Sequence, residues 1–211
     1  MKIVGLGYGC DVRLFIKNNF ESEIYPFDWL WCNIDFVIKT LDTDYFEYNE
    51  CEKLIAVWDP PYMCTYLFNN KCNSTKYKIC SVVSIHDIGE SQLKEDYISN
   101  IPKINKKYKN KLGRLYETLN LNEDVILIRK VINKDQRALD KIHDSNEKLN
   151  HLSDLLSKNF KAKITLCVVD DESFITKSGL NDNVKLFNSF VDLLVFIKNI
   201  KLSIEKISIE N

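Results

Sequence analysis

The sequence predicts an α/β (or α+β) fold in which a central β-sheet is flanked by helices. Short β-branched apolar runs recur along the chain, and stretches with apolar residues at helical spacing separate them. The chain has 211 residues, of which 45% are hydrophobic and 28% charged, an ordinary globular composition. A length of this order suits one domain better than two. We therefore expect residues 1–211 to form a single domain.

The first element is a short buried strand over residues 2–6. Gly7-Tyr8-Gly9 ends this strand, because two glycines permit a tight turn with unusual backbone angles. Apolar residues at helical spacing predict a helix directly after this turn (Val12, Phe15, Ile16 and Phe20). Cys10 therefore stands at the first strand-to-helix turn.

The next segment combines an aromatic block with a helix start. In Tyr25-Pro26-Phe27-Asp28-Trp29, the proline holds Tyr25 extended, and we expect the aromatic side chains to be buried. A second helix is predicted from Asn33, a favoured N-cap, with Val37 and Leu41 facing inward. Residues 44–75 show no clear pattern beyond the turn at Asp59-Pro60-Pro61.

The later elements follow from periodicity and from start and stop signals. Asp144 and Glu147 have the spacing of a capping box that opens a helix. The run from 76 to 88 predicts a strand that ends near His86, with Gly89 as its stop. The other expected elements are a helix over 103–119, strands over 124–129 and 163–169, and a helix around 190–200. We expect residues 171–211 to form a helical extension packed on the same core.

Charge and cysteine content narrow the function classes. Lys+Arg (29) and Asp+Glu (30) nearly cancel, so nothing indicates nucleic-acid binding. The longest apolar stretches fall far short of the ~20 residues of a membrane span. The seven cysteines form no disulfide framework, and no secretory signal precedes them, so we expect free thiols in a reducing cytoplasm. Without Cys-x-x-Cys pairs or suitably placed histidines, we expect no metal and no cofactor.

Cys10 is the best candidate nucleophile. The N–H groups at a helix N-terminus lack partners and carry positive potential, which stabilises a thiolate. The same groups can donate hydrogen bonds to an oxyanion formed when the thiolate attacks a carbonyl. The alternative is that Cys10 serves as a small buried hydrophobe.

His86, at a strand end, is the candidate general base and acid. The alternative is a histidine that ties down a loop. The adjacent Asp87 points to the opposite face of the strand, so a third group must come from elsewhere. Asp28 is the best choice, because a carboxylate among aromatics needs a partner. It is expected to accept a hydrogen bond from His86 or to pair with an arginine such as Arg129; the alternative is a helix N-cap.

These pieces occur in an order that a known family shares. They are Leu6 to Cys10, the block from Tyr25 to Trp29, His86-Asp87, the helix from Tyr108 to Leu115 and the strand from Val125 to Arg129. Over about residues 1–170 the sequence resembles the family described as "putative papain-like cysteine peptidases", a domain of unknown function found in bacteria and large DNA viruses. The resemblance implies a thiol nucleophile at Cys10 and a base at His86. It also implies the host cytoplasm as the location if the protein is viral. The basic pair usual after the helix tyrosine is reduced here to Asn110-Lys111, with Arg114 kept.

Three functions compete at this point. The first is a cysteine hydrolase or acyl transferase acting on a peptide or a small acyl compound, with Arg129, Arg114, Asp87 and Trp29 at the substrate. The second is an enzyme acting on a glycan or nucleotide, in which Arg129 and Arg114 hold an anionic group and Cys10 is structural. The third is a non-catalytic interaction module, for example a viral protein that modulates its host.

Overall fold

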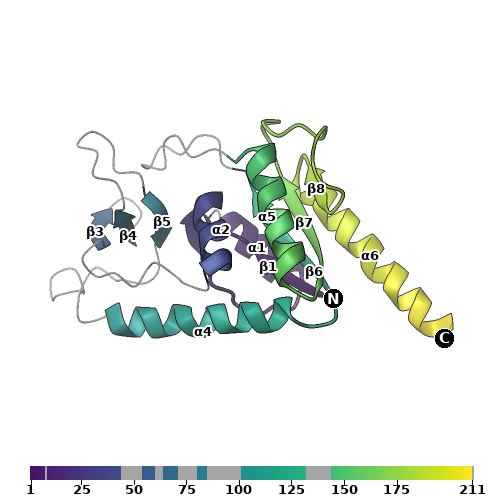
Figure 1. The fold of residues 1–211 in the computed structure, drawn as a ribbon, viewed down its shortest axis with the longest axis horizontal. Coiled ribbons are helices and arrows are strands. Elements are labelled where there is room, and N and C mark those ends of the chain that lie inside the picture. The colour runs from purple at the N-terminus through teal and green to yellow at the C-terminus, as the bar shows by residue number, and fades with distance from the viewer. Residues whose placement is uncertain are drawn as a thin grey trace.

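The computed structural model describes residues 1–7, 9–43, 54–59, 64–70, 80–84, 101–131 and 144–210. In these ranges the chain forms two four-stranded sheets, with helices on both faces of the first sheet (Figure 1). The fold is α/β, as the sequence predicts.

The first sheet is parallel, with the strand order β1-β6-β7-β8. Its strands are β1 (Lys2–Gly5), β6 (Asp124–Lys130), β7 (Lys163–Val169) and β8 (Val184–Phe187). Beyond the end of β1, the N–H of Leu6 donates to the carbonyl oxygen of Ile128 at 2.8 Å. Parallel sheets are covered on both faces, which explains why the strands read as nearly continuous apolar runs.

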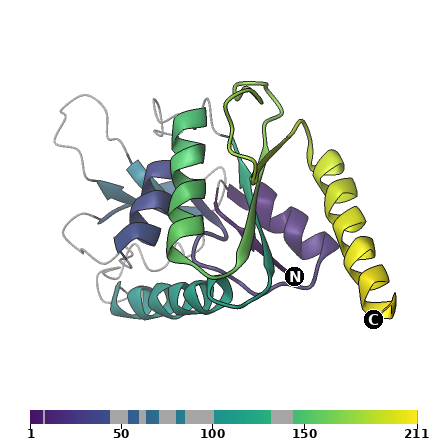
Figure 2. The same cartoon turned by 45° about the vertical axis from the view of Figure 1, so that its right-hand side comes forward.

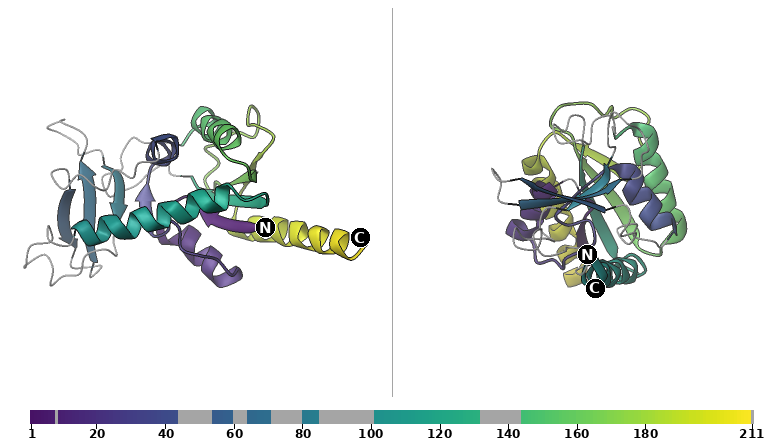
Figure 3. Two further views of the ribbon diagram at one scale, coloured as in Figure 1. Left: turned by 60° about the horizontal axis from the view of Figure 1, so that its bottom comes forward. Right: turned by 90° about the vertical axis from the view of Figure 1, so that its left-hand side faces the viewer.

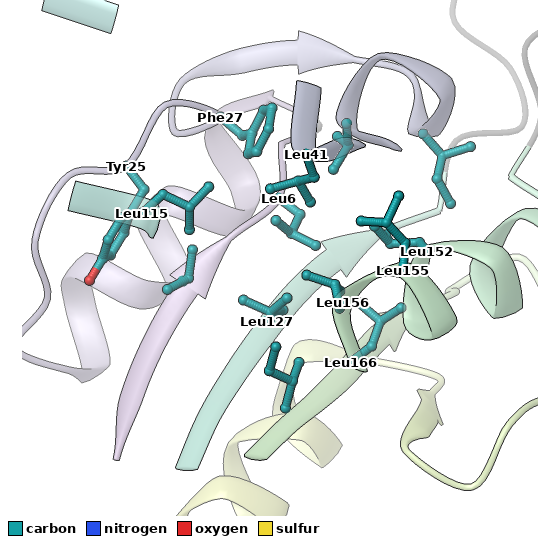
Figure 4. Close-up of a cluster of buried hydrophobic side chains, with 14 of the residues drawn as sticks. Leu6, Tyr25, Phe27, Leu41, Leu115, Leu127, Leu152, Leu155, Leu156 and Leu166 are labelled. Carbon is teal, nitrogen blue, oxygen red and sulfur yellow. The ribbon is translucent and has the colours of Figure 1, made fainter. Parts of the chain in front are cut away.

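Helices lie on both faces of this sheet (Figure 2). They are α1 (Gly9–Asn19), α2 (Ile34–Thr43), α4 (Ile101–Leu119), α5 (Asn146–Asn159) and α6 (Phe190–Glu210). Apolar side chains between the helices and the sheet form two clusters, one on each face. Ile126 and Ile128 of β6 face α1 and α6, whereas Val125 and Leu127 face the opposite side, as strand alternation requires. Figure 4 shows part of the cluster that contains Val125 and Leu127, where leucines of α2, α4 and α5 contact the strands.

The second sheet is antiparallel, with the order β2-β5-β4-β3. The sequence predicted β5, which lies within the strand expected over 76–88, but it did not predict β2, β3 or β4. It lies at the end of the molecule opposite the C-terminus (Figure 3). Its strands are β2 (Leu30–Cys32), β3 (Leu54–Asp59), β4 (Cys64–Asn70) and β5 (Cys80–Ser84). β2 pairs with β5, so that Leu30 lies opposite Ser84 and Cys32 opposite Val82.

Several predicted helix starts can be compared with the structure. α2 begins as predicted: Asn33 Oδ1 accepts from the N–H of Phe36 at 2.6 Å, and Val37 and Leu41 are buried. The predicted capping box at α5 is wrong. Its N-cap is Ser145, whose Oγ accepts from the N–H of Lys148 at 3.3 Å.

The C-terminal part departs from the prediction in one respect. β8 interrupts the stretch after residue 170, which we expected to be helical. α6 is longer than the helix predicted around 190–200, and its Leu193 and Ile197 are buried against the sheet. No helix in the described part of the chain combines the length and apolar character needed to cross a membrane.

Candidate functional site

Cys10 lies at the carboxyl edge of the parallel sheet, the edge at which open α/β sheets bind ligands. It is the second residue of α1, where the sequence predicts a helix start, and it follows the end of β1 by five residues. Its side chain is partly exposed and forms no disulfide. The first N–H groups of a helix have no partner within the helix, so this end of α1 suits a thiolate or an oxyanion.

The turn before Cys10 packs directly on β2. Gly7 has φ +82°, in the left-handed region that favours glycine. A Cβ at Gly7 would overlap Cys32 Sγ and lie 3.5 Å from the Leu30 carbonyl oxygen. The thiol of Cys32 donates to the Leu6 carbonyl oxygen at 3.9 Å. Only glycine therefore allows the turn and β2 to approach this closely.

Arg129, the sixth residue of β6, is fully buried beneath this turn. Its Nε and Nη2 donate to the two carboxylate oxygens of Asp144 at 2.7 and 2.8 Å. Its Nη1 donates to the Leu6 carbonyl oxygen at 3.0 Å, and Nη2 lies 3.4 Å from the Cys32 carbonyl oxygen. The structure contradicts the expectation that Arg129 binds the substrate or pairs with Asp28. Strand alternation turns the Arg129 side chain into the interior, where Asp144 neutralises its charge.

Asp28 is also buried, as predicted, and its cationic neighbour is Arg13 rather than Arg129. Oδ2 accepts from the N–H of Tyr25 at 2.8 Å and lies 3.5 Å from Arg13 Nη1. Oδ1 is buried, has no hydrogen-bond partner among the residues that the structure describes, and lies 2.6 Å from where a Cβ at Gly5 would be. The N-cap alternative is wrong, because a cap accepts from later N–H groups and Tyr25 precedes Asp28.

Burial raises the pKa of Asp28 to about 6, although the Tyr25 N–H, Arg13 and Lys111 act to lower it. Because the pKa of Asp28 in the folded protein exceeds its ordinary value of 3.8, the proton on Asp28 stabilises the fold at low pH. This contribution is lost as the pH rises through about 6.

We therefore expect Asp28→Asn, which cannot ionise, to gain stability relative to the natural protein as the pH rises from 4 to 8. The gain is at most about 3 kcal/mol, since one pKa unit corresponds to ~1.4 kcal/mol. Urea unfolding at each pH measures it, and Asp42→Asn, an exposed carboxylate change on α2, is the control. A stability difference that stays constant with pH would contradict the burial of an ionised Asp28.

Lys130 joins three elements at the same edge, and the sequence interpretation missed it. Its Nζ lies 3.1 Å from Asp11 Oδ2 at the start of α1 and 3.2 Å from Asp171 Oδ2 just after β7. Partial burial acts to lower the pKa of Lys130, but the hydrogen bonds with Asp11 and Asp171 outweigh it and raise the pKa. The available signal was position, because polar residues that end parallel strands converge at one edge.

Of the remaining predicted site residues, the structure describes Trp29 and Arg114 but not His86 and Asp87. Trp29 is partly exposed and has φ +66°, a strained conformation for a bulky residue. Arg114 Nη2 donates to the Ile24 carbonyl oxygen at 2.8 Å and thereby ties α4 to the segment before the aromatic block. His86 and Asp87 lie outside the described residues, so the proximity of Cys10 and His86 stays a prediction. Among the residues that the structure describes, no group of three His, Cys, Asp or Glu side chains could hold a metal ion.

Comparison with known proteins assigns most of the chain to a family. A family model described as "Putative papain-like cysteine peptidase" matches residues 1–172, close to the range of the resemblance seen in the sequence. The match ends just after β7, so that β8 and α6 lie beyond it. No curated protein and no solved structure is significantly similar to the chain.

Proposed function

Because the chain belongs to the family described as "Putative papain-like cysteine peptidase", we propose that it is a cysteine-dependent hydrolase or acyl transferase. In this proposal Cys10 is the nucleophile and His86 is the base. The observation that carries the proposal is the position of Cys10, partly exposed at the start of α1 and at the carboxyl edge of a parallel sheet. The substrate is a peptide or a small acyl compound.

The proposed reaction has two steps. His86 takes the proton of the Cys10 thiol, and the thiolate attacks the acyl carbon to form the C–S bond of an acyl-enzyme thioester. The N–H groups at the start of α1 donate to the oxyanion formed on the way. His86 gives its proton to the leaving amine or alcohol as the carbon–heteroatom bond breaks. His86 then takes a proton from water, or from another acceptor nucleophile, which attacks the thioester and releases Cys10.

Chain connectivity supports the partnership of Cys10 and His86. Ser84 is the last described residue of β5 and pairs with Leu30 of β2. The Leu30 carbonyl oxygen lies against Gly7, in the turn that leads to Cys10. His86 follows Ser84 by two residues, and two residues span at most ~7 Å. The described end of β5 therefore lies next to the turn before Cys10, two residues before His86 in the sequence.

Asp28 completes the proposed site as a positioning carboxylate. Oδ2 is engaged by Tyr25 and Arg13, whereas the buried Oδ1 has capacity to accept a hydrogen bond. Trp29, partly exposed beside Asp28, is the proposed apolar contact for the substrate. Arg129 is fully buried and bound to Asp144, so no observation favours an anion site built on it.

Thiol labelling tests the proposal. After brief treatment with limiting iodoacetamide, peptide mapping should find Cys10 alkylated first, with the buried Cys32 and Cys167 spared. Burial raises the pKa of Cys167 to about 12, which makes it an internal standard for an unreactive thiol. His86→Ala should slow Cys10 alkylation at pH 7 at least tenfold, an order-of-magnitude expectation for loss of a paired base.

His151→Ala, which changes an exposed histidine of α5, is the matched control and should leave the rate unchanged. Cys10→Ala should abolish hydrolysis of a quenched-fluorescent peptide library and of small thioesters. A Cys10 that is spared while other thiols react would refute the proposal, as would full hydrolysis by Cys10→Ala.

A further inference from the structure

We propose that Arg129 and Asp144 are positioning residues for this reaction. Their buried ion pair holds the turn before Cys10 against the paired strands β2 and β5, and β5 ends two residues before His86. The inference rests on the proposed function, because it concerns the geometry of the proposed nucleophile and base. Both side chains have 0% exposure, so neither touches a substrate directly.

The first backbone group that Arg129 binds is the carbonyl of Leu6, four residues before Cys10. Its oxygen accepts from Arg129 Nη1 at 3.0 Å and from the Cys32 thiol at 3.9 Å. The N–H of the same residue donates to the Ile128 carbonyl oxygen at 2.8 Å. The peptide groups on both sides of Leu6 are therefore fixed to β6, and Gly7 starts the turn from a fixed point.

The second backbone group that Arg129 contacts is the carbonyl of Cys32, at the end of β2. Arg129 Nη2 lies 3.4 Å from its oxygen, and Cys32 pairs with Val82 of β5. β5 is the strand that ends two residues before His86. One guanidinium thus links the turn that carries Cys10 to the strand pair that carries the chain toward His86.

Asp144 sets the orientation of this guanidinium from a rigid support. It binds the guanidinium with both oxygens and directly precedes Ser145, the N-cap of α5. α5 itself is held in the core by Leu149 and Leu152. A planar fork with five N–H donors can meet one carboxylate and two carbonyls together, whereas an ammonium on a flexible stem cannot reproduce that geometry.

A structural role alone does not require this ion pair. Apolar side chains of similar volume often replace a buried ion pair without loss of stability. Such a replacement at Arg129 and Asp144 would keep the core filled but release the carbonyls of Leu6 and Cys32. Positioning and stability can therefore be separated by experiment.

The test compares Arg129→Met/Asp144→Leu and Arg129→Lys with the natural protein. The measurements are the melting temperature, the pH profile of Cys10 alkylation and, on whichever test substrate the natural protein hydrolyses, kcat and KM. We expect both variants to fold and the pH profile of Cys10 alkylation to move toward that of an ordinary thiol. We also expect kcat to fall at least tenfold with little change in KM, since a misplacement of ~1 Å can lower the rate ~100-fold. Lys148→Met/Asp35→Leu removes an exposed ion pair, 2.6 Å long, and should change neither profile nor kcat.

Unchanged Cys10 reactivity and kcat in either folded variant would overturn the inference. So would failure of both variants to fold at 10 °C, because the ion pair would then be a requirement of the fold itself. Failure of the proposed function has a different signature: the natural protein would show no selective Cys10 labelling, and Cys10→Ala would keep its activity.

Discussion

Asp144→Ala is expected to lower the free energy of unfolding by about 3–5 kcal/mol, because removing one partner of a buried ion pair leaves an uncompensated charge. Burial by itself would lower the pKa of Arg129, but Asp144 and Cys32 raise it, so the guanidinium keeps its proton. An arginine cannot escape the penalty by deprotonating. The cost must therefore appear as lost stability or as water entering around Arg129.

Urea unfolding of Asp144→Ala at pH 7 measures this loss. Asp35→Ala is the matched control, since it removes a carboxylate from the exposed pair with Lys148 and should cost less than about 1 kcal/mol. Equal losses in the two variants would mean that Arg129 does not depend on Asp144 for its compensation.

The elements that the sequence predicted well are those with long, regular patterns. β7 has the predicted bounds, and β6 ends one residue later than predicted. The missed strands β2 and β8 have three and four residues, too few for a periodic signal, and are held by pairing with their neighbours. β3 and β4 were also missed: they have six and seven residues, but they lie in the stretch 44–75, where the sequence shows no clear pattern, and they pair with each other. The fold class could thus be predicted from local pattern, whereas the second sheet depends on tertiary pairing.

The candidate site divides along the same line. The position of Cys10 is a local property of a strand, a glycine turn and a helix, so the sequence was enough to predict it. The partner of Arg129 lies 15 residues away, and Asp144 also has the spacing of a capping box with Glu147. Two physical roles competed for Asp144, and the cap went to Ser145 because buried Arg129 had the stronger need for a carboxylate.

One signal for this pairing was present in the sequence. Arg129 directly follows the apolar run from Val125 to Ile128, which predicts a buried strand. A charge placed there must have a buried partner of opposite sign. The sequence alone, however, offers many carboxylates and does not say which of them the fold brings to Arg129.

Gly7→Ala should produce the other large effect, a loss of about 2–5 kcal/mol in the free energy of unfolding. The left-handed φ of +82° contributes about 1–2 kcal/mol of this loss, because a Cβ is strained in that region. The overlap of the new Cβ with Cys32 Sγ contributes about 1–3 kcal/mol, the range for overpacking a core.

A double-mutant cycle with Cys32→Ala separates the two contributions. Removing Sγ relieves the overlap but not the backbone strain, so Gly7→Ala should cost only about 1–2 kcal/mol in the Cys32→Ala background. Gly113→Ala, in the middle of α4, is the control and should stabilise by up to about 1 kcal/mol, because no described residue outside the local helix backbone lies within 4 Å of the new Cβ. If Gly7→Ala costs the same in both backgrounds, the turn before Cys10 does not rest on Cys32. That result would contradict the inference that close packing of Gly7 on Cys32 holds the turn before Cys10 against β2.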